Sequence, residues 1–175
     1  MLKPLKYSFF TIGLVLCAIV FCCLLPVSSV RAETIILTPP YPMAIFHFSG
    51  SRPNDLGVTQ GKLASCPSSP NCVSSQSTDS EHYIEPLASE ANPKETFVNL
   101  KKTLDSLKEA EIVTADENYI YVEFTSKLMG FVDDVEFYLD EATGTIQVRS
   151  ASRLGESDLG VNRKRIEMIR EELKA

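Results

Sequence analysis

The chain has 175 residues, of which 44% are hydrophobic and 23% charged, with a formal net charge of −6 at pH 7. This length suits one small globular domain with a single core and leaves little room for two. The excess of acidic side chains repels nucleic-acid phosphates and anionic lipids. We therefore expect no nucleic-acid partner, although a local basic patch remains compatible with this composition.

Residues 1–32 have the order of a secretory signal peptide. Lys3 and Lys6 precede an apolar run over residues 9–25, and Val30 and Ala32 supply small side chains before a cleavage point after Ala32. As a helix the run reaches roughly 26 Å, slightly short of a hydrocarbon core of roughly 30 Å. These features predict a cleaved signal, with a membrane anchor over residues 9–25 as the alternative.

Residues 33–62 are rich in proline and small polar residues. Proline fixes φ and lacks an N–H donor, so a long helix is excluded here. We predict an extended arm or linker, followed by a folded domain over residues 63–175. Apolar side chains such as Phe46 and Phe48 indicate that part of the arm docks onto another surface.

Three of the five cysteines lie in the targeting segment, which leaves Cys66 and Cys72. An even pair in an exported chain predicts a disulfide, within a loop rich in serine and turn-forming residues. A zinc site that adds His47 and His82 would have enough ligands, but the cysteine spacing is not that of a zinc finger. We accordingly predict neither a metal nor a cofactor.

The remaining sequence alternates between strand and helix patterns. It predicts a short strand at 82–87, an amphipathic helix from Pro93 to about Ala110, and a strand at 111–115. Alternating apolar and polar side chains predict strands at 119–126, 133–140 and 145–150, and a tight turn at 142–144. A last helix begins at about 159 or 161, capped by Ser157 or Asp158, and ends near 173.

This element order predicts an α+β fold. An antiparallel sheet of about four to five strands carries two helices on one face and a polar, solvated face opposite.

Three groups of polar side chains are candidates for chemistry. Carboxylates on neighbouring strands of the polar face, among Glu123, Asp134 and Glu136, form an acid–base pair in one interpretation. In the other they form cross-strand ion pairs, such as Glu136 with Arg149. Asp133 and Asp134 are too few to specify a calcium site. The basic run from Arg149 to Arg170 suits an anion at the helix start, or ordinary surface ion pairs.

Two separated strings resemble the domain of unknown function family 1499 (DUF1499) over about residues 63–174. They are CPSSPNCVSS at 66–75 and the block from 124 to 153 that contains GFVDDVEF. The resemblance implies an envelope setting, the periplasm or the thylakoid lumen, and no established reaction. The polar residues that match the family's pattern are Asn71, Ser74, Ser75, Asp133, Asp134, Glu136, Arg149, Ser150, Ser152, Arg153, Asp158, Asn162 and Arg163.

We expect the cysteine-bracketed loop to pack against the start of the last helix, so that these residues form one polar pocket. The leading hypothesis is a binding or assembly accessory module. It would recognise a small anionic ligand, or the polar surface of a membrane-protein complex, through Arg149, Arg153 and Arg163. We expect contact with the membrane only through an uncleaved N-terminal segment.

The alternative hypothesis is a hydrolase-like enzyme. It would use the carboxylates of Asp133, Asp134 or Glu136 with a serine or a metal-bound water. A perturbed carboxylate beside a serine would favour this enzyme, whereas charges paired with one another would favour the binding module.

Overall fold

The computed structural model describes residues 47–88 and 92–174. The predicted targeting segment, and the predicted arm as far as Phe46, lie outside the described residues. None of the helices in the described ranges is long and apolar enough to cross a membrane.

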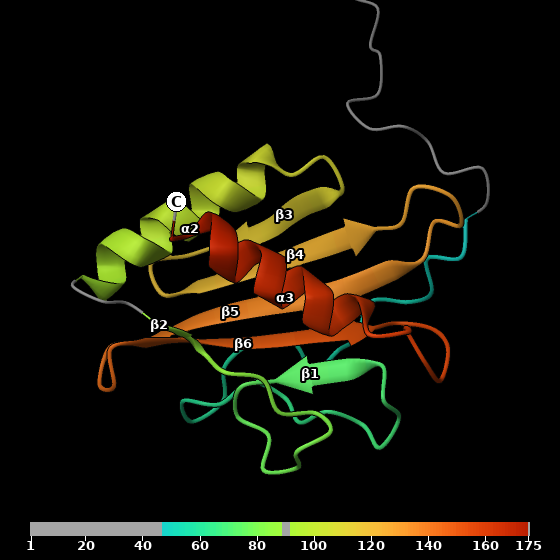
Figure 1. The fold of residues 1–175 in the computed structure, drawn as a ribbon, viewed down its shortest axis with the longest axis horizontal. Coiled ribbons are helices and arrows are strands. Elements are labelled where there is room, and N and C mark those ends of the chain that lie inside the picture. The colour runs from blue at the N-terminus through green and yellow to red at the C-terminus, as the bar shows by residue number, and fades with distance from the viewer. Residues whose placement is uncertain (1–46, 89–91, 175) are drawn as a thin grey trace, which may run out of the picture. The chain divides into compact units, whose positions relative to one another are not determined.

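One antiparallel sheet forms the centre of the domain (Figure 1). Its strands follow the spatial order β1-β6-β5-β4-β3, and β2 pairs with another part of β6. Both helices lie on the same face of the sheet. The predicted α+β fold is therefore confirmed. The elements are β1 (Cys72–Ser74), β2 (Leu87–Ala88), α2 (Pro93–Ser106), β3 (Ala110–Ala115), β4 (Tyr119–Thr125), β5 (Val132–Asp140), β6 (Thr145–Ser152) and α3 (Val161–Glu172).

The core lies between the sheet and the two helices. Phe137 on β5 pairs with Ile120 on β4 and Val148 on β6, and all three side chains are buried. Because side chains alternate along a strand, this register places the apolar residues of the central strands on one face. Leu100 of α2 and Ile166 of α3 complete the same core.

Helix α2 begins as expected and ends early. The Asn92 side chain accepts a hydrogen bond from the Glu95 N–H, and Pro93 occupies the first helical turn, where its missing N–H costs nothing. The predicted end near Ala110 is wrong, because the helix ends at Ser106. Ala110 instead pairs with Phe124 as the first residue of β3.

Two short strands differ from the sequence prediction. The serine-rich loop contains β1, in which Val73 reaches the core and the backbone pairs with β6. The strand predicted at 82–87 is reduced to a bridge at Tyr83 and the short β2. The carbonyl groups of residues 81, 83, 85 and 86 accept hydrogen bonds from arginines of α3, so they satisfy their bonding without a strand partner.

Residues 47–62 of the arm contact the face of the sheet that the helices leave uncovered. Phe48 stacks on Phe131, with 5.5 Å between ring centroids, and the Gly57 N–H donates to Glu136 on β5. Glu136 is fully buried, so the prediction of a solvated polar face is wrong. The arm supplies donors to carboxylates on this face and shields them from water.

Candidate functional site

The sheet divides the predicted site residues into two clusters. Successive residues of a strand point to opposite faces, so the neighbours Asp133 and Asp134 on β5 cannot share one pocket. The helix-side cluster contains Asp133, Ser150, Ser152, Asn162 and Arg165. The arm-side cluster contains Tyr119, Tyr121, Glu123, Asp134, Glu136, Arg149 and Arg153, together with Arg52 and Gly57 of the arm.

Asn162 is the centre of the helix-side cluster. Its side chain is fully buried at the start of α3. Its amide oxygen accepts hydrogen bonds from the Ser150 hydroxyl and from Arg165, at 2.5 and 2.7 Å. Its amide nitrogen donates to the Asn71 carbonyl and the Ser152 hydroxyl, both at 3.0 Å. One amide thus joins α3, β6 and the cysteine-bracketed loop.

Two further contacts hold that loop and the last helix in place. The Asn71 side chain donates to the Gly155 carbonyl at 2.6 Å. The Asp158 carboxylate accepts from the N–H groups of Gly160 and Asn162, where α3 begins. The N-cap residue of α3 is Gly160, so the predicted cap at Ser157 or Asp158 is wrong by two or three positions. The Asp158 carboxylate nevertheless binds N–H groups at the start of the helix.

Arg165 connects the helix-side cluster to the sheet. Its guanidinium binds Asp133 at 2.5 Å and lies over the Phe124 ring, 4.7 Å from the centroid. The sequence interpretation placed Arg165 in the basic run but did not pair it with Asp133, because a separation of 32 residues leaves no local spacing signal.

The arm-side cluster contains a densely paired arginine. Arg153 binds both oxygens of Asp134, at 2.7–3.1 Å, and also contacts Glu123 and the Tyr121 hydroxyl. Arg52 of the arm binds the same Glu123 oxygen as Arg153. Burial, followed by the hydrogen bond to Asp134, raises the pKa of Tyr121, so the tyrosine stays neutral and donates.

A second carboxylate on this face is fully enclosed. Glu136 accepts hydrogen bonds from the Tyr119 hydroxyl at 2.8 Å and the Gly57 N–H at 2.7 Å, and pairs with Arg149 at 3.3 Å. This is the cross-strand pair considered from the sequence, in a buried setting. The Arg149 Nε atom finds no hydrogen-bond partner among the described residues.

The remaining predicted site residues have structural partners of their own. Arg163 donates to the carbonyls of Glu81 and Tyr83, at 2.8 and 2.7 Å. The Ser75 hydroxyl lies at the sheet edge, where it bonds Gln147 and accepts from a backbone N–H of β6. The thirteen candidate residues therefore do not form a single pocket.

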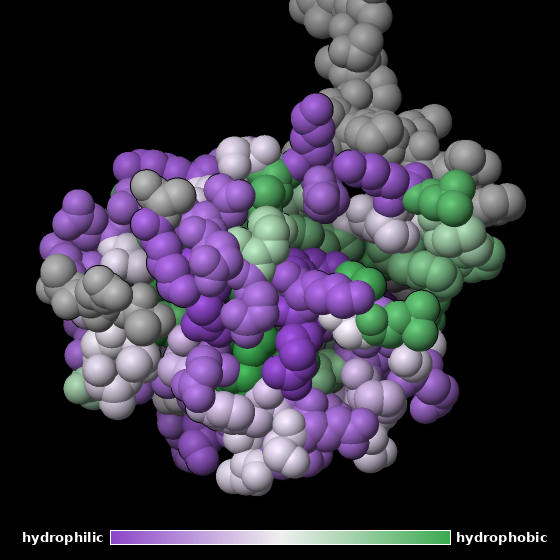
Figure 2. All heavy atoms as spheres, viewed as in Figure 1, coloured by the Kyte–Doolittle hydropathy of each residue, from purple (hydrophilic) through white to green (hydrophobic). Residues whose placement is uncertain are grey.

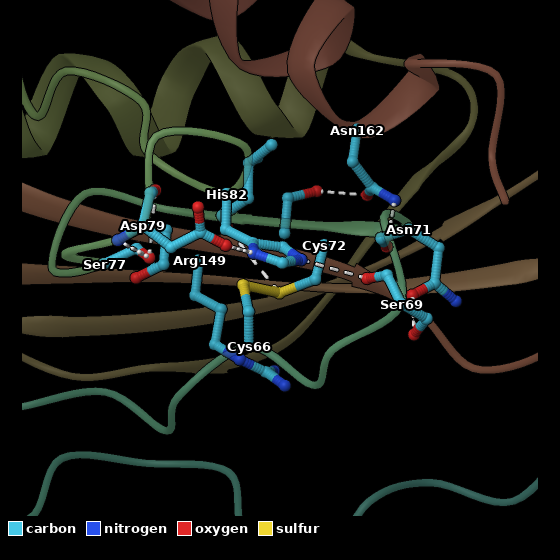
Figure 3. Close-up of a disulfide and its surroundings, with 12 residues drawn as sticks. Cys66, Ser69, Asn71, Cys72, Ser77, Asp79, His82, Arg149 and Asn162 are labelled. Atoms are coloured by element: carbon cyan, nitrogen blue, oxygen red, sulfur yellow. Dashed lines mark hydrogen bonds and ion pairs between the residues drawn. A yellow bond between two sulfur atoms is a disulfide. The ribbon is translucent and has the colours of Figure 1, made fainter. Parts of the chain in front are cut away.

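Cys66 and Cys72 form a disulfide, with their Cα atoms 5.7 Å apart (Figure 3). The predicted pair is thus present, and the zinc alternative loses both thiolates. In the described ranges, no three His, Cys, Asp or Glu side chains gather as they would around a metal ion.

A pocket of about 510 Å³ beside the disulfide is lined by both Ser74 and His82. Neither side chain is arranged for nucleophilic catalysis. The Ser74 hydroxyl accepts from the Gln76 N–H, while the two ring nitrogens of His82 face Asp79 and the Ser69 carbonyl. A serine nucleophile needs a base within hydrogen-bond reach, and both ring nitrogens of His82 already face partners other than Ser74.

His82 makes the stability of the domain depend on pH. It is buried, and hydrogen bonds first to Asp79 and then to the Ser69 carbonyl raise its pKa. A raised folded-state pKa stabilises the fold below the ordinary value of about 6.5, and this stabilisation is lost as the pH rises through the folded-state value. We expect Tm to fall as the pH rises above about 6.5.

The His82→Gln variant should show a smaller fall in the same thermal unfolding experiment. His47→Gln is the matched control, because His47 is exposed and is the only other histidine in the chain. An equal fall in wild type and His82→Gln would show that another group carries the pH dependence.

The chain matches the family described as "Protein of unknown function (DUF1499)" over residues 62–173. No curated protein and no solved structure matches it. The matched residues include the two strings at 66–75 and 124–153 and every residue of the helix-side cluster, whereas residues 47–61 of the arm lie outside the match. Because the match covers well over half of the sequence, the chain belongs to the DUF1499 family.

Proposed function

We propose that the protein is an exported interaction module that binds its partner through an apolar surface at one end of the sheet. The observation that carries this proposal is the contrast between the buried charged side chains and the exposed apolar ones. Buried ionisable groups pair with one another inside the domain, while large apolar side chains are exposed together at one end.

The three arginines considered for anion binding already have partners within the domain. Arg153 is held by Asp134, Arg149 pairs with Glu136, and Arg163 binds two backbone carbonyls. At Arg149 or Arg153, an incoming anion would leave a buried carboxylate unpaired, which is strongly unfavourable. At Arg163 it would have to displace two backbone carbonyls. This geometry supports a structural role for the arginines.

The hydrolase alternative receives little support from the carboxylates. Asp133, Asp134 and Glu136 each bind an arginine, and Asp133 faces the opposite side of the sheet from the other two. A general base needs a free lone pair directed at a substrate. These carboxylates are better described as internal counter-ions.

The proposed binding surface, which we call the apolar end, consists of large hydrophobic side chains from the loops and the start of α3 at one end of the sheet. Its members are Phe48, Leu128, Phe131, Leu154, Leu159 and Val161. All are exposed, and Leu159 is 85% exposed. Figure 2 shows hydrophobic residues gathered where Figure 1 places the loops that follow β4 and β6. Clustered exposed hydrophobic residues are typical of interaction sites.

The export part of the proposal is supported by two independent features. The first 32 residues have the order of a signal peptide. The Cys66–Cys72 disulfide suits an oxidising compartment outside the cytoplasm. The intact mass of the protein from its own compartment should correspond to a chain beginning at Glu33 and be two hydrogens lighter before reduction. A reduced, full-length mass would contradict export.

Site-specific photo-crosslinking of the full chain tests the binding surface. A photoreactive side chain at Leu159 should give adducts in the native compartment. The same group at Val98, which is also exposed but lies on α2, is the matched control and should give none. Equal labelling from both positions, or none from Leu159, would contradict an interaction site at the apolar end.

A further inference from the structure

The apolar end is built from loop tips of three separate chain segments. Phe48 comes from the arm, Leu128 and Phe131 from the loop between β4 and β5, and Leu159 from the loop before α3. Phe48 stacks on Phe131, while Leu128 and Val161 line one shallow groove of about 590 Å³. The arm, the loop between β4 and β5 and the start of α3 therefore meet at one end of the sheet, although they are far apart in sequence.

Leu159 occupies a backbone conformation that its side chain disfavours. Its φ is +56°, in the left-handed region where glycine or asparagine is normally found. Its side chain is 85% exposed and thus contributes little to the core. Fold stability alone favours a different residue at this position. A leucine here is explained if its side chain becomes buried in another apolar phase.

Basic side chains border the same surface in a protein whose overall charge is negative. Lys127 adjoins Leu128 in sequence, and Lys164 lines the groove together with Val161. Both lysines are exposed. Lysine beside exposed leucine is typical of surfaces that enter the headgroup region of a bilayer, because the aliphatic stem lies in the apolar layer and the ammonium group reaches the phosphates.

The chain also enters the described domain at this end, since Phe48 packs directly on Phe131. The apolar run at residues 9–25 precedes it. The intervening residues 26–46 would span at most roughly 70 Å if fully extended. Should the run stay uncleaved, as in the alternative to cleavage after Ala32, the apolar end would be the part of the domain closest along the chain to the membrane.

We infer that the apolar end docks on a lipid bilayer, with Leu128, Phe131 and Leu159 inserted among the headgroups and Lys127 and Lys164 at the phosphates. This inference rests on the proposed function, for which it names the partner. A bilayer accommodates separate loop tips without the shape complementarity that a protein partner requires. The insertion is driven mainly by apolar burial, so it persists on neutral lipid and strengthens moderately on anionic lipid.

The absence of tryptophan from the sequence allows a direct test. Single tryptophans are introduced into the full chain as Leu128→Trp, Leu159→Trp and Val98→Trp. The proteins are mixed with vesicles of brominated phosphatidylcholine, with and without phosphatidylglycerol. Tryptophan emission should shift to the blue and be quenched at positions 128 and 159. It should be unaffected at 98, because α2 begins beside the turn at Gly144, at the opposite end of β5.

Leu159→Asn in the Leu128→Trp background separates binding from folding. Asparagine tolerates the left-handed conformation, so Tm should not fall. The equilibrium constant for insertion, measured from the quenched fraction at position 128, should fall about ten-fold with the loss of one inserted leucine. Unchanged quenching in this variant would overturn the role of Leu159 and with it the inference.

The other outcomes distinguish this inference from the proposed function. If positions 128 and 159 are not quenched while Leu159 crosslinks to a protein, the bilayer inference fails and the interaction module stands. If neither quenching nor crosslinking occurs, both fail. Equal quenching at all three positions would indicate nonspecific adsorption of the domain and would also overturn the inference.

Discussion

Arg153→Ala is expected to lower the free energy of unfolding by about 3–5 kcal/mol, the usual consequence of removing one partner from a buried ion pair. The Arg153 and Asp134 side chains are 5% and 1% exposed, so water cannot replace the lost guanidinium. Glu123 would also lose a partner and would keep Arg52 and Tyr121. Chemical denaturation of wild type and variant measures the difference.

Two further variants test the physical reason. Arg153→Met combined with Asp134→Asn removes both charges, so we expect a smaller loss than for Arg153→Ala alone. Lys101→Ala breaks an exposed ion pair with Asp105 and should change the free energy of unfolding by less than about 1 kcal/mol. A loss of similar size in Arg153→Ala and Lys101→Ala would mean that the arm-side cluster is not an essential part of the fold.

Asn162→Ala has the second large expected effect, a loss of about 3 kcal/mol in the free energy of unfolding. The substitution removes one hydrogen-bond partner each from the Ser150 hydroxyl, the Ser152 hydroxyl and the Asn71 carbonyl. Ser150 still accepts from Arg165, and the Asn71 carbonyl still accepts from the Ser152 N–H. Buried polar groups without a partner destabilise a fold by about 1–3 kcal/mol each, although compensation among neighbours reduces the sum. Urea unfolding monitored by circular dichroism measures the loss.

Asn99→Ala is the matched control for Asn162→Ala. Asn99 lies on the exposed face of α2 and accepts a hydrogen bond only from Lys102 among the contacts described. Its replacement should change the free energy of unfolding by no more than about 0.5 kcal/mol. If Asn162→Ala were equally mild, the amide would not be the element that joins the cysteine loop to α3.

The sequence by itself determined the fold class and the division of residues between the two faces of the central strands. Alternation with a period of two specifies which side chains face together, and this signal is strong in 119–126 and 133–140. The cysteine pair and the two family strings likewise required no tertiary information. They indicated the disulfide and the chain's membership of DUF1499, which the structure and the family match then bore out.

Only the tertiary structure decided which polar residues meet. Arg52 and Glu123 are 71 residues apart, and Gly57 and Glu136 are 79 apart, so no local spacing encodes these contacts. The serine-rich loop contains β1 because β6 offers a free edge, which composition cannot reveal. The same alternation that predicted the strands also placed Asp133 and Asp134 on opposite faces. The expected single pocket became two clusters because the sheet itself lies between them.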